Sequence, residues 1–92
     1  MDIARIPLEK FCDISKVEQL HEQLEARLRA GAAVEIDASA VERIDTSTLQ
    51  LLAACLRTLE QHHLEGCIVA PSACFSATAR MMGLAGALKL SN

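Results

Sequence analysis

The sequence predicts a small α/β domain, with a mostly parallel or mixed sheet of about four strands and three to four helices. Short apolar runs alternate with longer segments of helical periodicity, in the order strand, helix, strand, helix, strand, helix. The connections are only a few residues long, which favours right-handed crossovers between parallel neighbours. The chain has 92 residues and contains no linker or repeat, so we expect a single domain over residues 1–92.

The first strand is predicted over residues 3–8, with Pro7 confining its later part to an edge or an end. The first helix begins with a capping-box pattern, Ser15 followed by Glu18, and ends at Gly31 because glycine readily adopts the left-handed conformation that stops a helix. One clear strand therefore precedes the first helix. The apolar stripe of this helix consists of Val17, Leu20, Leu24 and Leu28.

Two further strands are predicted over residues 32–36 and 67–70. Both are short apolar runs, the pattern typical of strands buried within a parallel sheet, so we expect both faces of the sheet to be covered there. Asp37 follows the first of these strands, and the turn at residues 65–66 leads into the second. Pro71 ends the second strand, because proline cannot continue the ladder of backbone hydrogen bonds.

The second helix is predicted from about Thr46 to His63, and its apolar surface is wider than a single stripe. Leu51, Ala54 and Cys55 extend that surface, which indicates a helix buried on two sides or a patch for a partner. The expected core stripe is Leu49, Leu52, Ala53, Leu56, and Leu59 or Glu60.

The third helix is predicted to begin after Ser72 as its cap and to close at Gly83. Its expected stripe is Phe75, Thr78, Ala79 and Met82. A brief hydrophobic tail follows, which we expect to pack back onto the sheet through Leu84, Ala87 and Leu88.

The composition argues against nucleic acid and membranes as partners. Nine Lys and Arg against twelve Asp and Glu give a net charge of −3, so phosphate backbones and anionic lipids are not attracted. Two Phe and no Trp or Tyr leave few platforms for stacking bases. The N-terminus lacks a secretory signal and no apolar run approaches the roughly 20 residues that span a bilayer, so we expect a cytoplasmic protein without membrane insertion.

Metal, cofactor and catalytic signatures are missing from the sequence. The four cysteines, at 12, 55, 67 and 74, show no Cys-x-x-Cys spacing, which favours free, packed thiols in a reducing compartment. The histidines lack ligand spacing, and adjacent His62 and His63 point in different directions on a helix. Neither a phosphate-binding loop nor a nucleophile elbow is present. We therefore expect no metal, no cofactor and no enzymatic activity.

The candidate site is the start of the second helix, where Asp45, Thr46 and Ser47 follow one another. A helix start leaves backbone N–H groups unpaired and carries a partial positive charge, so acceptors and anions are stabilised there. A phosphate on Thr46, or less favourably on Ser47, would occupy such a place. Asp, Ser and Thr are also the commonest helix caps, and a purely structural cap is the alternative interpretation.

Polar residues before this helix extend the candidate surface. Asp37 and Ser39 follow the preceding strand and are candidates to line the same surface as Thr46, with a turn held by their hydrogen bonds as the alternative. Glu42 and Arg43 are either rim charges of a docking surface or solvated charges of a turn.

The stretch from Val34 to Leu52, with the strand at residues 67–70 and the segment 81–88, resembles the STAS domain of bacterial anti-sigma-factor antagonists and its relatives. The pair Asp45-Thr46 looks like the family's Asp-Ser/Thr pair, whose hydroxyl residue is phosphorylated in switching members. That residue is Thr46 by position. Two departures are visible: Thr48 stands where many members have glycine, and only one strand is evident before the first helix, where the family commonly has two.

The resemblance implies a non-enzymatic, regulatory, protein-binding module. Antagonists of this family bind a histidine-kinase-like ATPase that acts as anti-sigma factor, and they lose that binding when phosphorylated. Other small STAS proteins resemble the cytoplasmic accessory subunit of a phospholipid-transporting ABC system, which docks on the ATPase subunit, or accompany chemotaxis proteins. The expected partner contacts are Asp37, Ser39, Asp45, Thr46, Ser47, Thr48, Leu49 and Leu51.

Overall fold

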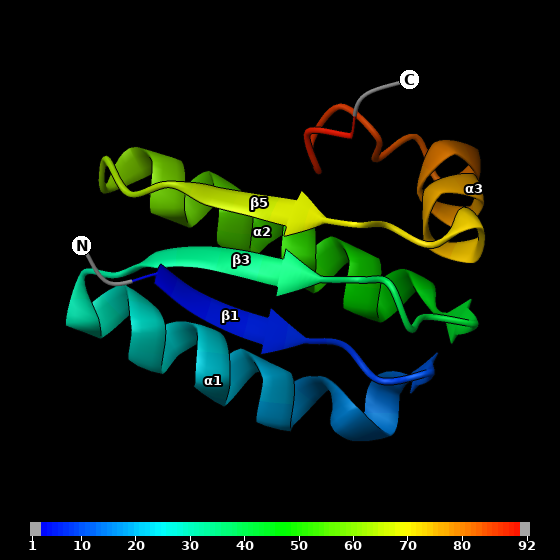
Figure 1. Cartoon of the computed structure of the whole chain (residues 1–92), viewed down its shortest axis with the longest axis horizontal. Helices are drawn as coiled ribbons and strands as arrows, with labels where there is room; N and C mark the ends of the chain where they lie inside the picture. The colour runs from blue at the N-terminus through cyan, green and yellow to red at the C-terminus, as the bar shows by residue number, and fades with distance from the viewer. Residues whose placement is uncertain (1–2, 91–92) are drawn as a thin grey trace.

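The computed structural model describes residues 3–90 as five strands and three α-helices, with one or two strands before each helix (Figure 1). The strands are β1 (Ile3–Pro7), β2 (Phe11–Cys12), β3 (Ala33–Asp37), β4 (Arg43–Ile44) and β5 (Gly66–Val69). The helices are α1 (Val17–Ala30), preceded by a 3-10 turn at Ile14–Lys16, then α2 (Thr46–Gln61) and α3 (Ala73–Met81).

All strand pairings among these residues are parallel, and they form two sheets rather than one. The larger sheet has the order β1-β3-β5, and the smaller pairs β2 with β4. The small α/β class is therefore confirmed, whereas the single sheet of about four strands is replaced by a three-stranded and a two-stranded sheet. β2 is a second strand before the first helix; two residues are too short to show the alternation from which a strand is predicted.

One face of the larger sheet is covered by α1 and α2, which lie behind it in Figure 1. Ile6 and Ile36 point to these helices and are buried. On the other face Arg5 pairs with Glu35 at 2.9 Å, and Cys67 is exposed in the same row of residues. The expectation that both faces are covered is wrong here, because α3 lies beyond the carboxyl end of β5 instead of across the strands (Figure 1). Cys67 is consequently a free but not a packed thiol.

The first helix starts differently from the predicted capping box. Its N-cap position is Lys16, which makes no side-chain cap, and Ser15 is instead held by Asp13, whose carboxylate accepts hydrogen bonds from the Ser15 amide and hydroxyl. Asp13 thereby starts a 3-10 turn before α1, in which the Lys16 amide donates to the Asp13 carbonyl at 3.0 Å. The predicted end is confirmed: Gly31 adopts a φ of 68° and its amide bonds back to the last turn.

The core lies between the sheet and the helices, and α2 contributes more buried side chains to it than any other described element. The stripe of Leu49, Leu52, Leu56 and Leu59 is fully buried, as predicted. Gly66 of β5 approaches this stripe so closely that a Cβ there would lie 2.5 Å from Leu59 Cδ1 and 2.9 Å from Leu56 Cδ2. Gly66 is the first residue of β5, whereas the sequence predicted a turn at this position.

The third helix and the segment after it close the carboxyl end of the domain. Ser72 caps α3 as predicted, accepting from the Phe75 amide at 3.1 Å and donating to the Val41 carbonyl at 2.7 Å. Phe75 is fully buried, but Met82 is 42% exposed because α3 ends one residue earlier. In the tail Leu88 is fully buried and Ala87 is exposed, so only part of the predicted tail packing is present.

Candidate functional site

The start of α2 is fixed by the smaller sheet. β4 pairs with β2 through two residues, and the Asp45 amide then donates to the Cys12 carbonyl at 3.0 Å. Asp45 is the N-cap of α2 and has extended backbone angles, φ −95° and ψ 171°. The helix therefore begins at a point that is attached to the segment between β1 and α1, and Thr46 follows as its first helical residue.

Asp45 and Thr48 form the cap itself. One carboxylate oxygen of Asp45, Oδ1, accepts hydrogen bonds from the Thr48 amide at 2.9 Å and from the Thr48 hydroxyl at 2.8 Å. Thr48 is only 2% exposed, so these bonds satisfy a buried hydroxyl. The Thr48 side chain thus stabilises the helix start.

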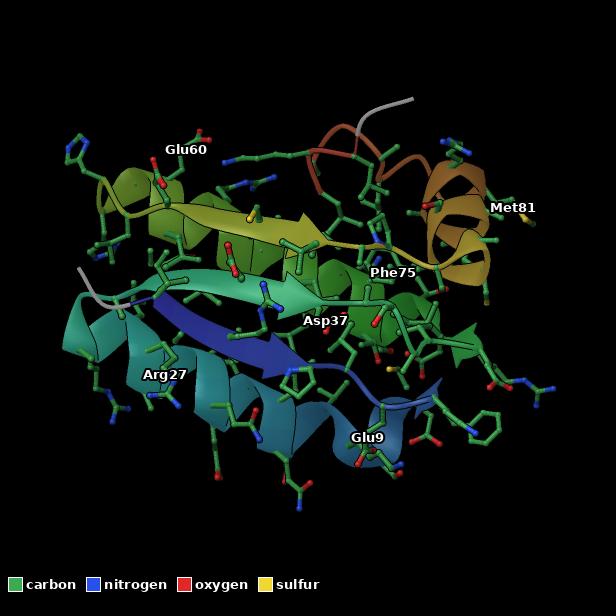
Figure 2. All side chains as sticks on the ribbon, in the orientation of Figure 1. Glu9, Arg27, Asp37, Glu60, Phe75 and Met81 are labelled. Carbon is green, nitrogen blue, oxygen red and sulfur yellow. The ribbon has the colours of Figure 1, made fainter. Side chains whose placement is uncertain are left out.

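Thr46 presents its hydroxyl to solvent beside α3. The side chain is exposed, and its Oγ1 lies 3.7 Å from Met82 Sδ, a weak hydrogen-bond acceptor. Neighbouring Met81 is 85% exposed and points away from α3 (Figure 2). The hydroxyl is therefore accessible and lies against a thioether rather than a charged or strongly hydrogen-bonding group.

The two residues after Ser47 do not belong to this surface. Thr48 and Leu49 are 2% and 0% exposed, so neither side chain offers area to a partner. This corrects their place in the expected contact set: positions three and four of the helix face the cap and the core, while Thr46 faces outward. Leu51 is half-buried and lines a groove between α1 and α2, on a different side of α2 from Met82.

Asp37 and Ser39 form a turn at the carboxyl end of β3. Asp37 Oδ1 accepts from the Ser39 amide at 2.9 Å, and hydrogen bonding by the Ser39 hydroxyl and amide lowers the pKa of the Asp37 carboxyl. Asp37 lies at the same end of the sheet as α3 (Figure 2), but no described contact joins it or Ser39 to Thr46. Glu42, an exposed turn residue, lies 3.8 Å from Lys10 in an ion pair.

Met82 is the functional candidate that sequence reasoning missed, because its position in a helical stripe suggested the core. The available signal was Gly83, which marks the end of the helix and so leaves the residue before it free to turn outward. Phe11, 51% exposed on β2 opposite Arg43, was likewise not predicted as a surface residue.

Residues 3–90 contain neither a metal-binding cluster nor a membrane-spanning helix. Within that range no group of three or more His, Cys, Asp or Glu side chains is arranged to hold a metal ion. None of the helices in the same range combines the length and apolar character needed to cross a bilayer.

The arrangement defines a class of protein, a small parallel α/β domain that exposes a helix-start hydroxyl next to a second helix. The chain belongs to the STAS domain family: the family model described as "Mlab, STAS domain" matches residues 4–91. Members of this family are generally regulatory, non-enzymatic binding modules.

Comparison with solved structures supports the same fold. The chain is similar to the protein titled "NMR Structure of the protein TM1081", with a TM-score of 0.82 at 16% identity, over 98% of this chain and 74% of that one. No curated protein matches this sequence. At this identity the structural likeness speaks for the fold alone.

Proposed function

We propose that this STAS domain regulates a protein partner by binding it through the surface at the start of α2, here called the Thr46 surface and formed by Asp45, Thr46 and Met82. The observation that carries the proposal is the exposed Thr46 hydroxyl, 3.7 Å from Met82 Sδ. A hydroxyl beside a polarisable, flexible thioether suits an adaptable protein contact. The exposed position of Thr46 also leaves its hydroxyl accessible to a kinase.

Phosphorylation of Thr46 controls this contact in the proposed mechanism. A phosphate adds close to two negative charges at the first position of α2, where unpaired amides stabilise it. The cap itself need not change, because Asp45 is bonded to Thr48 and not to Thr46. A partner matched to the neutral surface then meets a charge next to Met82, with repulsion and desolvation opposing binding. The proposed partner is a histidine-kinase-like ATPase that acts as anti-sigma factor and kinase.

A second candidate is favoured by the family model, whose description names Mlab. In this second candidate function, the Thr46 surface docks permanently on the ATPase subunit of a phospholipid-transporting ABC system. Thr46 then supplies a hydrogen bond and a shape, and it is not modified. The two candidates share the Thr46 surface and differ in the partner and in whether phosphate is present.

The experiment is affinity purification of the tagged protein from its native host, with mass spectrometry of its partners and of the Thr46 peptide. The set comprises wild type, Thr46→Ala, Thr46→Glu and, as a matched charge control at the far end of α2, Gln61→Glu. A switch retains its partner in Thr46→Ala and loses it in Thr46→Glu, and wild type carries phosphate on Thr46. If the protein is a fixed subunit, both Thr46 variants bind the partner more weakly, and wild type carries no phosphate on Thr46.

Gln61→Glu should bind like wild type in either case. The assignment of the Thr46 surface is overturned if both Thr46 variants also bind every recovered partner like wild type, while circular dichroism shows that all proteins are folded.

A further inference from the structure

A groove of about 160 Å³ runs between α1 and α2, separate from the Thr46 surface. Its lining is largely apolar, and it comprises His21, Leu24, Glu25, Leu28, Leu51, Ala54, Cys55, Thr58 and Leu59. Burial raises the pKa of the Cys55 thiol, so this side chain behaves as a small apolar group. An apolar space of roughly 150 Å³ accepts a benzene-sized group, which corresponds to one aromatic or branched aliphatic side chain.

Acidic side chains border the groove on the exposed flank of α1, and Glu25 is the one among them that lines it. Glu18, Glu22 and Glu25 follow at spacings of four and three residues, so they form one ridge along the helix. Glu25 contacts His21 at 3.2 Å and Arg29 at 3.1 Å, whereas Glu18 and Glu22 take part in no ion pair within residues 3–90. The α2 side of the groove is neutral, and its Thr58 hydroxyl is already donated to the Ala54 carbonyl at 3.0 Å.

We propose that the groove binds a basic amphipathic helix of a partner protein, with one large apolar side chain in the groove and Lys or Arg beside the acidic ridge. An amphipathic helix is a common ligand of a groove between two helices, because its apolar side chains recur along one face. The unpaired carboxylates of Glu18 and Glu22 supply the complementary charge and the orientation.

The same charges argue against other occupants. A second copy bound through its own α1 would bring Glu18 and Glu22 of the two chains together, and an anionic lipid surface would meet the same repulsion. The groove is also independent of the proposed switch, since Leu51 and Ala54 line the groove while Thr46 contacts Met82.

The test uses two synthetic helical peptides with the same leucine pattern, one carrying lysines and the other glutamates between the leucines. Binding to the full chain is measured by calorimetry and mapped by NMR shifts. The lysine peptide should bind more tightly, should shift Leu51, Ala54 and Cys55, and should weaken as salt rises. Equal binding of the two peptides, or shifts outside the groove, would overturn the proposal.

Two pairs of variants make the test specific. Ala54→Arg places a long cationic side chain at the groove and should weaken lysine-peptide binding by about tenfold or more, while Ala77→Arg, exposed on α3 and outside the groove, should not. Glu22→Lys should weaken it by about threefold to tenfold, and the distant Glu65→Lys should leave it unchanged. Equal effects within either pair contradict the proposal.

A third measurement identifies the natural occupant. A photo-crosslinking residue at position 54 in native cells should capture a segment with an amphipathic helical pattern and a net positive charge, and one at position 77 on α3 should not. Capture of a second copy of this chain, or of a net acidic segment, overturns the proposal. Thr46→Glu should leave this crosslink unchanged, so failure here is distinguishable from failure of the Thr46 surface.

Discussion

Thr48 donates two hydrogen bonds to a single oxygen of Asp45, from its amide at 2.9 Å and from its hydroxyl at 2.8 Å. Any residue except proline could donate the hydrogen bond from its amide, but the hydrogen bond from the hydroxyl requires Ser or Thr. Since Thr48 is 2% exposed, its hydroxyl has no water to replace this partner. The pair therefore holds the backbone on both sides of Thr46.

Replacing Thr48 should measure the value of the hydroxyl bond. We expect Thr48→Val to lower the free energy of unfolding by about 1 kcal/mol, because the shape is nearly kept and one hydrogen bond is lost. Thr48→Ser retains the hydroxyl and should lose less, mainly the contacts of one buried methyl group, about 0.8 kcal/mol. Urea unfolding followed by circular dichroism measures both, and a Thr48→Val variant as stable as wild type contradicts the expectation.

Met82 should matter for binding more than for stability. Because the side chain is 42% exposed, Met82→Lys should change the free energy of unfolding by no more than about 0.5 kcal/mol. Partner recovery should nevertheless fall, since a cation replaces the apolar neighbour of Thr46. Ala77→Lys, exposed elsewhere on α3, is the control and should recover the partner normally. Unchanged recovery in Met82→Lys would remove this residue from the Thr46 surface.

Gly66 should resist substitution for reasons of space. An added Cβ would overlap Leu59 Cδ1 and Leu56 Cδ2, both in fully packed side chains, so Gly66→Ala should destabilise the fold by about 1–3 kcal/mol. Gly86→Ala meets no atom within 4 Å and serves as the matched control. Thermal unfolding should separate the two variants clearly. Equal melting temperatures would mean that the leucines move aside without strain.

Acid should destabilise the fold through its turn carboxylates. The pKa of Asp37 is lowered from 3.8 by hydrogen bonds from Ser39, and the pKa of Asp13 by hydrogen bonds from Ser15. A lowered folded-state pKa gives stability that is present above the unfolded value and is lost as pH falls through the folded value. We expect the free energy of unfolding to decline below about pH 4. Asp37→Asn should show a shallower decline in pH-dependent urea melts; an identical slope would assign the effect elsewhere.

The main elements of the fold were predictable because their signals are local. Gly31 and Ser72 mark a helix end and a helix start through their own conformational and hydrogen-bonding preferences, and the structure confirms both. Ser15 was misleading because Asp13, two residues earlier, takes the capping position: its carboxylate accepts from the Ser15 amide and its carbonyl from the Lys16 amide. Strands of two residues, such as β2, leave no periodicity to detect.

The position of the site at the start of α2 was predictable from the sequence, but the residues that surround Thr46 were not. Asp45 at the N-cap follows from residue type, but the approach of Met82 to Thr46 joins residues 36 positions apart in the chain. Periodicity placed Leu49 correctly in the core stripe, while the expected contact set placed the same residue on the surface. Burial resolves this conflict in favour of the core. Whether Thr46 is phosphorylated depends on a kinase, which no property of this chain encodes.

Leu88 lies seven residues beyond the end of α3 and is fully buried in the core. A chain still being synthesised, with everything up to Leu84 outside the ribosome, therefore has both sheets and all three helices available and still lacks part of its interior. Vectorial synthesis thus keeps the domain from completing its packing until the segment that carries Leu88 emerges. During that interval the apolar surface that Leu88 will cover is open to chaperones.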